Sequence, residues 1–451
     1  MEPVFKTMDE FYEFLYESRP HQQIKLGLER IFCLSRRLGY PEKSFRSIHI
    51  AGTNGKGSVT RMISSFLTAM GYTVGANYSP HLINFSERIT LNDEPIPDKD
   101  CLRVLNAIYP AIAQMDQMDQ KMKPSFFEIV TIMAFQYFME EKVDFASIEV
   151  GMGGRLDASN ILRPEVCAIT SIGFDHMKSL GNTLAMIAGE KAGIIKKKVP
   201  VVCGAIRPEA AAAIRKRARL MESRAYFIGE DYSFYPKHCA IDDNRFDYFE
   251  PGYSLKDISL RLNGRHQFLN AATAICAYRR LCYRTGVLYQ EETVRSVLRK
   301  VTWPGRFERI ATAPDIVIDG GHNPPAFETL VKAWREYYGD QKAIFVTGIL
   351  ADKDYPRMIE IIAPILSHVI VTEPKAGERV QIEEVAEAFR ERVGGVQTEL
   401  IKDHREACRR ALALSGKEKP ILSAGSLYLV GYIKERFLEC LIPASDSKVS
   451  Y

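Results

Sequence analysis

Residues 47–70 read SIHIAGTNGKGSVTRMISSFLTAM, and the rest of the fold is built around this stretch. A short apolar strand with Ile48 and Ile50 runs into a glycine-rich turn, and an amphipathic helix follows as far as Gly71. This order is typical of a phosphate-binding loop, because glycines let backbone N–H groups face an anion at a helix N-terminus. Lys56 adds a full positive charge. The stretch therefore predicts a nucleotide-phosphate site made of Asn54, Gly55, Lys56, Gly57 and Ser58.

The loop departs from the strict pattern G-x-x-x-x-G-K-[ST]. The first glycine position falls on Ile50, and Gly57 takes the place of the hydroxyl residue, which moves to Ser58. The simpler alternative is a tight turn with an exposed lysine. Three glycines around a lysine, between a strand and a helix, favour the phosphate site instead. A hydroxyl after the lysine can also hold Mg²⁺.

Composition excludes several classes of protein. The chain has 451 residues, which suggests two domains, and 60 basic against 56 acidic residues leave a net charge of only +4. We therefore expect neither nucleic acid nor a membrane as a partner. Nine scattered cysteines form no C-x-x-C pair, as expected for buried thiols in a reducing compartment. With no apolar signal peptide in MEPVFKTMDEF, we expect a cytoplasmic protein.

Alternating strands and helices predict an α/β fold. Before the phosphate loop we expect a helical segment in which Ile24, Leu28 and Leu38 share a face and Leu26–Arg30 is helical. Residues 229–262 are aromatic and Asp-rich with period-two alternation, which predicts a small β insertion. Further strands of the first sheet are expected at 73–76, 145–150, 166–173, 199–204 and 224–228.

Trp303–Arg306 interrupts the pattern and marks the expected domain boundary. The predicted organisation is an ATP-binding domain at 1–303, a Rossmann-like domain at 304–440 and a frayed tail at 441–451. In the second domain strands are expected at 316–319, 343–347, 368–372, 399–401 and 421–424.

Polar side chains at strand ends suggest a metal site. Glu149 ends one apolar strand, and His176 follows the tip of another in the same predicted sheet. A carboxylate there is costly without a cation, although a single histidine at a strand end is usually structural. Carboxylate, imidazole and the Ser58 hydroxyl together are reasonable ligands for Mg²⁺ or Mn²⁺.

A charged pair, Glu190-Lys191, lies on an otherwise apolar helix. A surface ion pair would explain it simply. The apolar neighbours, such as Ile187 and Ala192, indicate instead that at least one of the two charges is buried and is either functional or neutralised.

Ten motifs in order carry a family resemblance: AGTNGKGS, SPHL with SERI, FFE, EVGMGGRLDASN, SIGFDH, LGNTLAMIAGEKAGI, GRHQFLNA, WPGRFE, DGGHNP and LADKD. The chain resembles the bacterial folylpolyglutamate synthase/dihydrofolate synthase family of the Mur ligase superfamily. The match spans about 45 to 355, with the expected sheet pattern continuing to about 435. One departure is that the family's common DGAHNP reads DGGHNP here.

The resemblance implies roles for particular residues. The expected ATP contacts are Asn54, Gly55, Lys56, Gly57, Ser58, Asn270, Arg306 and Asp319, with His322 beside them. Two Mg²⁺ sites would be served by Ser58, Ser79, Glu149 and His176. Lys191 matches the lysine that the family carboxylates to N6-carboxylysine, which would make it a further, anionic metal ligand. The implied catalytic residues are Lys56, Glu149, His176 and Lys191, and the implied pterin pocket comprises Leu28, Phe126, Phe127, Glu128, Gly153, Gly154 and Arg155.

The resemblance also implies the reaction. ATP phosphorylates a substrate carboxylate, and the amine of L-glutamate attacks the resulting acyl phosphate. Whether the acceptor is dihydropteroate, a reduced folate or both stays open, and the resemblance favours a monomer.

Three alternative functions fit the sequence less well. A cell-wall Mur ligase normally carries a UDP-binding domain before the loop, and only about fifty residues precede Gly52. A GTPase switch needs an N-K-x-D motif, and the chain has no Asn-Lys pair. A non-catalytic relative is disfavoured because every charged position that the chemistry needs is filled.

Overall fold

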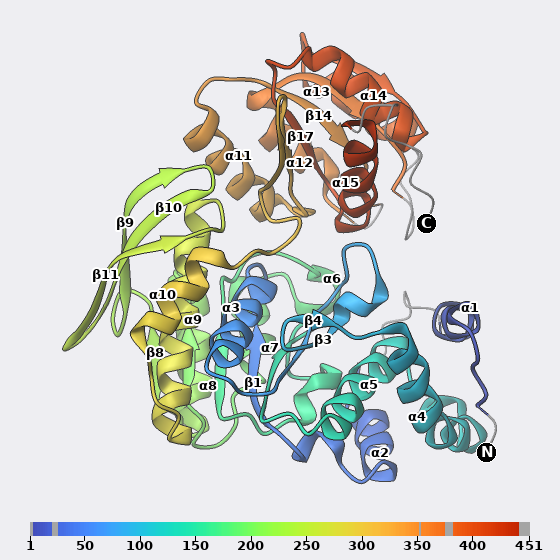
Figure 1. The fold of residues 1–451 in the computed structure, drawn as a ribbon, viewed down its shortest axis with the longest axis vertical. Helices are drawn as coiled ribbons and strands as arrows, with labels where there is room; N and C mark the ends of the chain where they lie inside the picture. Colours follow the sequence, from blue (N-terminus) through green and yellow to red (C-terminus); the bar gives the residue numbers. More distant parts are fainter. Residues whose placement is uncertain (1–2, 20–25, 351–352, 375–381, 442–451) are drawn as a thin grey trace.

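The computed structural model describes residues 3–19, 26–350, 353–374 and 382–441. Within these residues the strands form one sheet of eight, one of three and one of six strands. Helices flank the two larger sheets, and the predicted α/β class is confirmed. In Figure 1 the six-stranded sheet and its helices lie above, the eight-stranded sheet lies below, and the small sheet stands at one side.

The phosphate loop follows the central strand of the eight-stranded sheet. The strand order is β4-β3-β2-β5-β1-β6-β7-β8. The strands β2, β5, β1, β6, β7 and β8 run parallel, so their carboxyl ends meet at one edge, where α/β sheets place ligands. Their bounds are β1 Arg46–Ala51, β2 Val74–Asn77, β5 Phe145–Glu149, β6 Val166–Ile169, β7 Val201–Cys203 and β8 Ala225–Phe227, with an antiparallel hairpin of β3 Ile89–Leu91 and β4 Glu94–Pro95.

Alternation along β1 explains the layers. Ile48 and Ile50 face a core shared with α3 (Lys56–Ala69), α9 (Arg265–Thr285) and α10 (Glu291–Lys300). Ala51 faces the opposite side, in a core with α7 (Leu184–Ala192) and α8 (Pro208–Leu220). A third core joins α2 (Glu29–Arg37), α4 (Asp98–Met118) and α5 (Phe126–Glu140) to Ile148 of β5.

The small sheet lies where a β insertion was expected. Its antiparallel strands are β9 (Ser233–Ala240), β10 (Asp243–Glu250) and β11 (Tyr253–Leu260). Phe246 packs on Phe268 of α9, with 5.3 Å between ring centroids. Asp242, in the turn before β10, forms a 2.8 Å ion pair with Arg309 of the six-stranded sheet. The insertion therefore contacts both halves of the molecule.

The six-stranded sheet has the order β12-β13-β17-β14-β15-β16, and only β12 is antiparallel. The strands are β12 Glu308–Thr312, β13 Asp315–Ile318, β14 Ala343–Thr347, β15 Leu366–Val371, β16 Gln397–Leu400 and β17 Ile421–Ala424. The helices are α11 Pro324–Tyr338, α12 Tyr355–Ile362, α13 Ile382–Arg392, α14 His404–Ser415 and α15 Leu427–Leu441.

Some local predictions were wrong. The helix α2 begins at Glu29, so Leu28 precedes it and Leu26–Arg30 is not one helical turn; Gly27 breaks the helix with φ +132°. The strand predicted to reach Gly173 ends at Ile169, because the following residues hydrogen-bond to the phosphate loop instead. The edge strands β3, β4 and β12 were not predicted. Ile24 and the tail 442–451 lie outside the described residues.

Helices of membrane-spanning length and apolarity are absent from the part of the chain that the structure describes.

Candidate active site

The phosphate loop is shaped by two close approaches. Gly52 has φ +150°, and a Cβ there would lie 1.8 Å from the Thr170 hydroxyl oxygen. Gly55, the residue before α3, has φ +87°, and its Cβ would lie 2.3 Å from the Asn270 side-chain oxygen. Both conformations are ones that only glycine adopts without strain. The structure thus places Asn270, a predicted ATP contact, directly against the loop.

The end of β6 holds the loop in place. The Thr53 N–H donates to the Ser171 carbonyl at 2.8 Å. The hydroxyls of Thr170 and Ser171 both donate to the Asn54 carbonyl, at 2.7 and 3.1 Å. These bonds fix the backbone before a ligand arrives, which lowers the ordering cost of binding. Sequence reasoning missed them because the hydroxyls were assigned to a strand.

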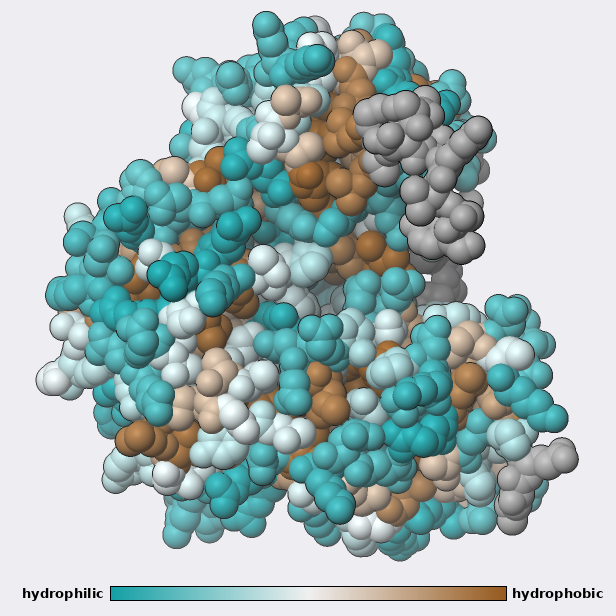
Figure 2. Space-filling view, in the orientation of Figure 1, coloured by the Kyte–Doolittle hydropathy of each residue, from teal (hydrophilic) through white to brown (hydrophobic). Residues whose placement is uncertain are grey.

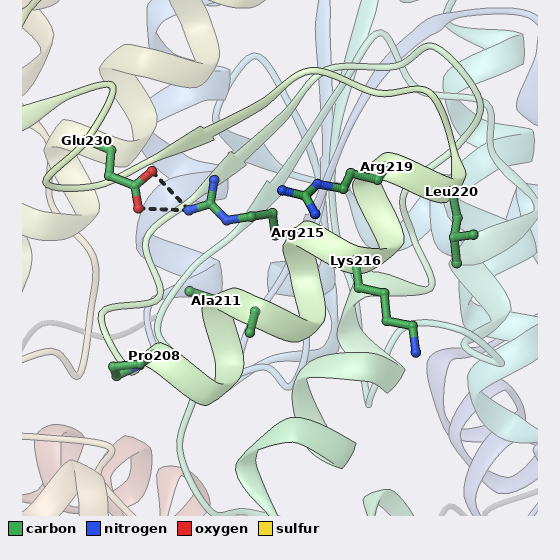
Figure 3. A pocket seen from close by; sticks show the side chains of 8 residues that line it. Pro208, Ala211, Arg215, Lys216, Arg219, Leu220 and Glu230 are labelled. Carbon is green, nitrogen blue, oxygen red and sulfur yellow. Dashed lines mark hydrogen bonds and ion pairs between the residues drawn. The ribbon is translucent and has the colours of Figure 1, made fainter.

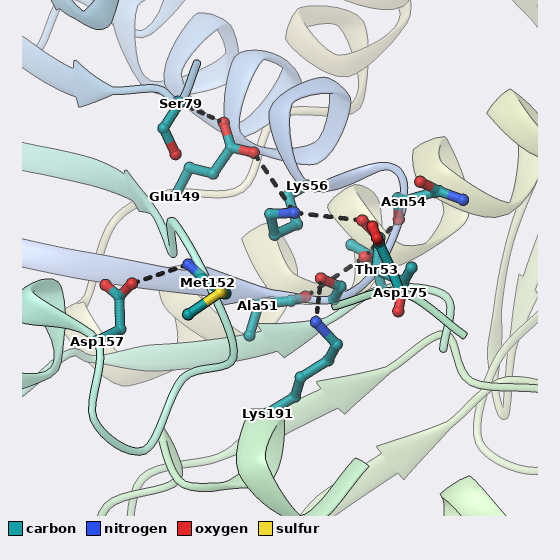
Figure 4. A network of polar contacts seen from close by, with 12 residues as sticks. Ala51, Thr53, Asn54, Lys56, Ser79, Glu149, Met152, Asp157, Asp175 and Lys191 are labelled. Atoms are coloured by element: carbon teal, nitrogen blue, oxygen red, sulfur yellow. Dashed lines mark hydrogen bonds and ion pairs between the residues drawn. The ribbon is translucent and has the colours of Figure 1, made fainter. Parts of the chain in front are cut away.

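Lys56 lies between the loop and the end of β5 (Figure 4). Its Nζ donates to the Thr53 carbonyl at 3.2 Å and is 3.9 Å from Oε1 of Glu149. Glu149 is only 5% exposed, and it accepts the Ser79 N–H at 3.2 Å. Burial raises the pKa of Glu149, and Lys56 and the Ser79 N–H partly offset that rise. Because the Lys56 ammonium lies 3.9 Å from the buried Glu149 carboxylate, it can interact with an added ligand as well as with Glu149.

Lys191 is a buried cation that contacts the same loop. It is 4% exposed, and its Nζ donates to the Gly52 carbonyl at 2.7 Å. Burial, helped by Lys56, lowers the pKa of Lys191 to about 7. Its neighbour Glu190 points away to Arg155 at 3.0 Å, so the two residues of the predicted pair lie apart. The expectation that one of these charges is buried agrees with this arrangement.

Oxygen donors gather at the same edge. Ser58 is 1% exposed, and the buried Ser79 hydroxyl has no hydrogen-bond partner among the described residues. With Glu149 these groups form a hard, oxygen-rich set that fits Mg²⁺. The described residues contain no group of three or more His, Cys, Asp or Glu side chains placed to hold a metal, so the hydroxyls are needed for such a site.

His176 stands at the rim of this edge. It adopts the left-handed conformation at φ +49°, its side chain is 38% exposed, and its Nε2 lies 3.9 Å from Asp175. Burial lowers the pKa of His176, and the Asp175 carboxylate opposes that shift. Left-handed backbone at a non-glycine residue is uncommon and recurs at functional sites.

The second sheet presents its own turn to the site, after β13. Asp319 accepts the N–H groups of Phe307 and Gly321, at 2.8 and 2.7 Å. His322 Nδ1 lies 2.8 Å from the Gly320 carbonyl, and burial lowers the pKa of His322 to about 4. Burial raises the pKa of Asp319, and Arg306 counteracts this. The predicted nucleotide contacts of this domain are therefore brought together.

One hydrogen bond joins the two edges directly. Asn323 Nδ2 donates to Oδ2 of Asp175 at 3.1 Å, while Asn323 Oδ1 caps α11 by accepting the Ala326 N–H. A Cβ on Gly173 would lie 3.3 Å from Pro325. Asn323 was not among the predicted site residues, although the DGGHNP motif contains it.

Four of the predicted pterin residues, Leu28, Phe126, Phe127 and Glu128, lie at or near the start of α5. Ser125 and Glu128 form the predicted capping box, and Glu128 also pairs with Arg30 at 3.0 Å. The Phe127 ring occupies the space that a Cβ on Gly151 would fill. Leu28 belongs to the same apolar core as Phe126 and Phe127.

The glycines of the following loop are closely packed. Gly153 has φ +68°, and a Cβ on Gly154 would lie 2.9 Å from the Lys191 carbonyl oxygen. The loop therefore links the pterin candidates to the helix that carries Lys191. Arg155, the last of them, is on the surface, with a side chain 55% exposed.

Sequence reasoning missed a buried arginine near these residues. Arg88, from the SERI motif, donates to His81 Nδ1 at 2.8 Å and lies over the Phe126 ring at 5.4 Å. Tyr16 also packs on Phe126, with 5.2 Å between the two ring centroids.

The surface is hollowed between the upper and lower halves of the molecule (Figure 2). A separate surface pocket of about 650 Å³ is lined by α8 and Glu230, and no residue of the phosphate loop lines it (Figure 3).

Comparisons with known proteins agree with this geometry. A model of the Mur ligase middle domain matches residues 50–278, and a model of the Mur ligase glutamate ligase domain matches residues 305–427. The chain is 36% identical over 417 residues to the dihydrofolate synthase/folylpolyglutamate synthase of Bacillus subtilis, covering 92% of this chain and 95% of that protein. The chain belongs to the folylpolyglutamate synthase/dihydrofolate synthase family.

Solved structures of this family superpose on nearly the whole chain. The Mycobacterium tuberculosis folylpolyglutamate synthase, complexed with ADP and AMPPCP, has a TM-score of 0.88 and 32% identity, covering 95% of this chain and 98% of that one. Escherichia coli FolC, in complex with DHPP and ADP, has a TM-score of 0.86 and 26% identity, covering 98% and 100%. The predicted family and the ligase class are confirmed, and the cell-wall ligase alternative is not favoured. The division at residues 303/304 and the individual site roles stay predictions.

Proposed function

We propose that the chain uses ATP to activate the carboxylate of a folate or of dihydropteroate as an acyl phosphate, which the amine of L-glutamate then attacks. Family membership supports the ATP-dependent ligation of glutamate to a folate. The single observation that carries the proposal is the placement of Lys56, which faces Glu149 across the mouth of a glycine loop locked by β6. Phosphoryl transfer depends on positioning and charge neutralisation, and these are what the loop supplies.

Each residue of the first edge has a task in this scheme. The helix α3 and Lys56 would bind phosphate oxygens, while Asn270 borders the loop at Gly55. Ser58, Ser79, Glu149 and His176 would hold Mg²⁺, which neutralises phosphoryl oxygens when it is bound. The Ser79 hydroxyl, which has no partner within the described part of the chain, supports this assignment, because a buried hydroxyl without a hydrogen bond is costly.

Lys191 is proposed to carry a carbamate. An uncharged amine adds to CO₂ to form the carbamate and release one proton, so a lysine with a pKa of about 7 is suited to the reaction at neutral pH. The product would turn a buried cation into an anion beside Gly52, on the side from which Lys191 reaches the loop. Such a carbamate would add negative charge, which favours the binding of a metal cation.

The second edge is proposed to complete the nucleotide site. Asp319 and His322 lie on the turn after β13, and Arg306, from the segment before β12, is close enough to Asp319 to offset part of the rise that burial causes in its pKa. These three residues would contact ATP from the side of the second sheet. Closure of this edge on the loop would exclude water, which otherwise hydrolyses an acyl phosphate. We also propose a monomer that acts in the cytoplasm, from the resemblance and the sequence composition respectively.

The test is Mg²⁺-ATP-dependent incorporation of L-glutamate, measured in parallel with dihydropteroate and with tetrahydrofolate. Incorporation with both acceptors identifies a bifunctional enzyme, and incorporation with one assigns the step. ATP binding without incorporation into either acceptor would refute the proposed reaction.

A further inference from the structure

Trp303 lies against the phosphate loop although it belongs to the segment between the two large sheets. If Gly57 carried a Cβ, its three nearest atoms would all belong to the Trp303 indole, at 2.9 to 3.1 Å. The same indole packs on Tyr78, with 4.6 Å between ring centroids and 43° between planes. Tyr78 is itself buried. One half-buried side chain thus contacts two separate loops of the first edge.

The two contacted residues precede the two candidate metal hydroxyls. Gly57 comes immediately before Ser58, and Tyr78 immediately before Ser79. The Ser79 N–H also bonds to Glu149. A shift of the indole would therefore displace both hydroxyls by way of their neighbours. In the first turn of α3, where alanine is intrinsically preferred, the glycine at position 57 is explained by the space that the indole fills.

The segment after Trp303 is fastened to the second sheet. The Gly320 N–H donates to the Gly305 carbonyl at 2.7 Å, and the Phe307 N–H donates to Asp319 at 2.8 Å. Gly305 also approaches Leu82, where a Cβ would lie 3.2 Å from the leucine side chain. Within five residues the chain is bound to the turn that carries Asp319 and packed against the loop that carries Ser58.

We propose that Trp303 is a positioning residue that sets the spacing of the Ser58 and Ser79 loops and ties it to the turn of the second sheet. The inference rests on the proposed use of ATP at this loop. Trp303 would act on the two hydroxyls through its contacts with Gly57 and Tyr78. The consequence is specific: Gly57 is required because of the indole, not because a Cβ would obstruct the phosphate cradle.

A double-mutant cycle tests this dependence. Gly57→Ala is expected to lower kcat/KM for ATP on the order of 100-fold, the effect of a misplacement of about 1 Å at a reacting site. Trp303→Leu alone is expected to raise KM for ATP and to lower kcat, since both loops lose their spacer. In the double variant, Gly57→Ala should add less than about twofold to the Trp303→Leu defect, because the clash is gone. Effects that multiply would overturn the proposal.

The matched control is Gly394→Ala, since a Cβ there meets nothing within 4 Å. ADP affinity is measured by calorimetry on the wild type, the two single variants and the double variant. It separates the positioning role of Trp303 from the proposed ligase function. If the wild-type chain binds ADP but ligates no glutamate, the proposed function fails, while the cycle can still be scored on ADP affinity. If Trp303→Leu does not fold, a Trp334→Phe variant leaves Trp303 as the sole tryptophan. Its emission should then change as ADP is added, and an unchanged spectrum would contradict the proposal.

Discussion

The two large sheets present the same local design at their facing edges, with opposite chemistry. In each, a buried parallel strand leads through a glycine-bearing turn into a helix: β1 through Gly52–Gly55 into α3, and β13 through Asp319–Asn323 into α11. At the first edge the cations Lys56 and Lys191 both contact the phosphate loop, and the nearby Ser79 hydroxyl has no hydrogen-bond partner among the residues that the structure describes. At the second edge Asp319 and His322 are hydrogen-bonded within their own half of the molecule, to Phe307, Gly321 and Gly320.

The difference indicates a division of labour. At the first edge two lysines accompany one buried carboxylate, so this edge is suited to bind the reacting phosphates. At the second edge Asp319 and His322 already have hydrogen-bond partners, so this edge is suited to form a rigid surface that faces the first edge. If this comparison holds, substitutions at the first edge should affect the chemical step most, and those at the second edge should act through the contact between the edges.

Lys56→Ala is expected to have the largest effect, because it removes the charge that faces the phosphoryl group. We expect kcat to fall by about 10³-fold or more. The unfolding free energy should also fall, because the buried Glu149 carboxylate loses a cation that offsets its burial. Steady-state ligation assays and chemical denaturation measure the two quantities. Lys197→Ala is the control, since that lysine is exposed and pairs with Glu222 at the surface. Near-normal turnover of the Lys56 variant would refute the assignment of the first edge.

Lys191→Met should separate function from stability at the same edge. We expect a loss of ligation on the order of 10²-fold, because the variant cannot form the proposed carbamate. Stability should change in the opposite direction. The unfolded chain keeps this proton up to a pH of about 10.4. The folded chain releases it near pH 7, since burial lowers the pKa of Lys191 to about 7. The stability of the wild type should therefore rise with pH between these values.

The measurement is the unfolding free energy from pH 6 to 10 in CO₂-free buffer. At pH 6 the methionine variant should be more stable than the wild type by a few kcal/mol, at about 1.4 kcal/mol per pKa unit. The gap should close toward pH 10. A gap independent of pH would show that Lys191 is not a desolvated cation. Ligation by the wild type should also increase with added bicarbonate, more at pH 8 than at pH 6.

The first edge could be predicted from sequence far better than the contact between the edges. Strand β1, the glycine turn and α3 are consecutive, so local pattern and motif chemistry are sufficient to place Lys56. Glu149 and His176 follow strands of one parallel sheet, whose geometry brings their ends to one edge. The apolar neighbours on α7 predicted that at least one charge of the Glu190-Lys191 pair is buried, and the structure shows that Lys191 is.

The remaining features depend on tertiary contacts that carry no local signal. Asn323 and Asp175 are 148 residues apart, and nothing in the pattern around either residue specifies the other. The indole of Trp303 fills a space between Gly57 and Tyr78, which belong to two separate segments of the first edge. The helix predicted around Leu28 was wrong because helical periodicity continued through Gly27, whose backbone conformation interrupts it.

Asn323→Asp should test the contact between the edges without disturbing the second edge itself. Aspartate caps a helix as well as asparagine does, so α11 should keep its N-terminus. The new carboxylate would face Asp175, and like charges at this distance repel. We expect ligation to fall by about tenfold, with little change in stability. Asp175→Asn in the same chain should restore an attractive pair, and a defect that this second change does not relieve would mean that the contact is incidental.

Arg155→Ala should have the smallest effect and marks the border of the first edge. The side chain is more than half exposed and pairs with Glu190, and such surface pairs contribute about 0–1 kcal/mol to stability. We expect the unfolding free energy to change by less than about 1 kcal/mol and KM for the folate acceptor to rise by less than about tenfold, with KM for ATP unchanged. Initial rates with each substrate varied in turn measure the split. An equal rise in KM for ATP would extend the phosphate site to Arg155, and the first edge would then be wider than the two lysines define.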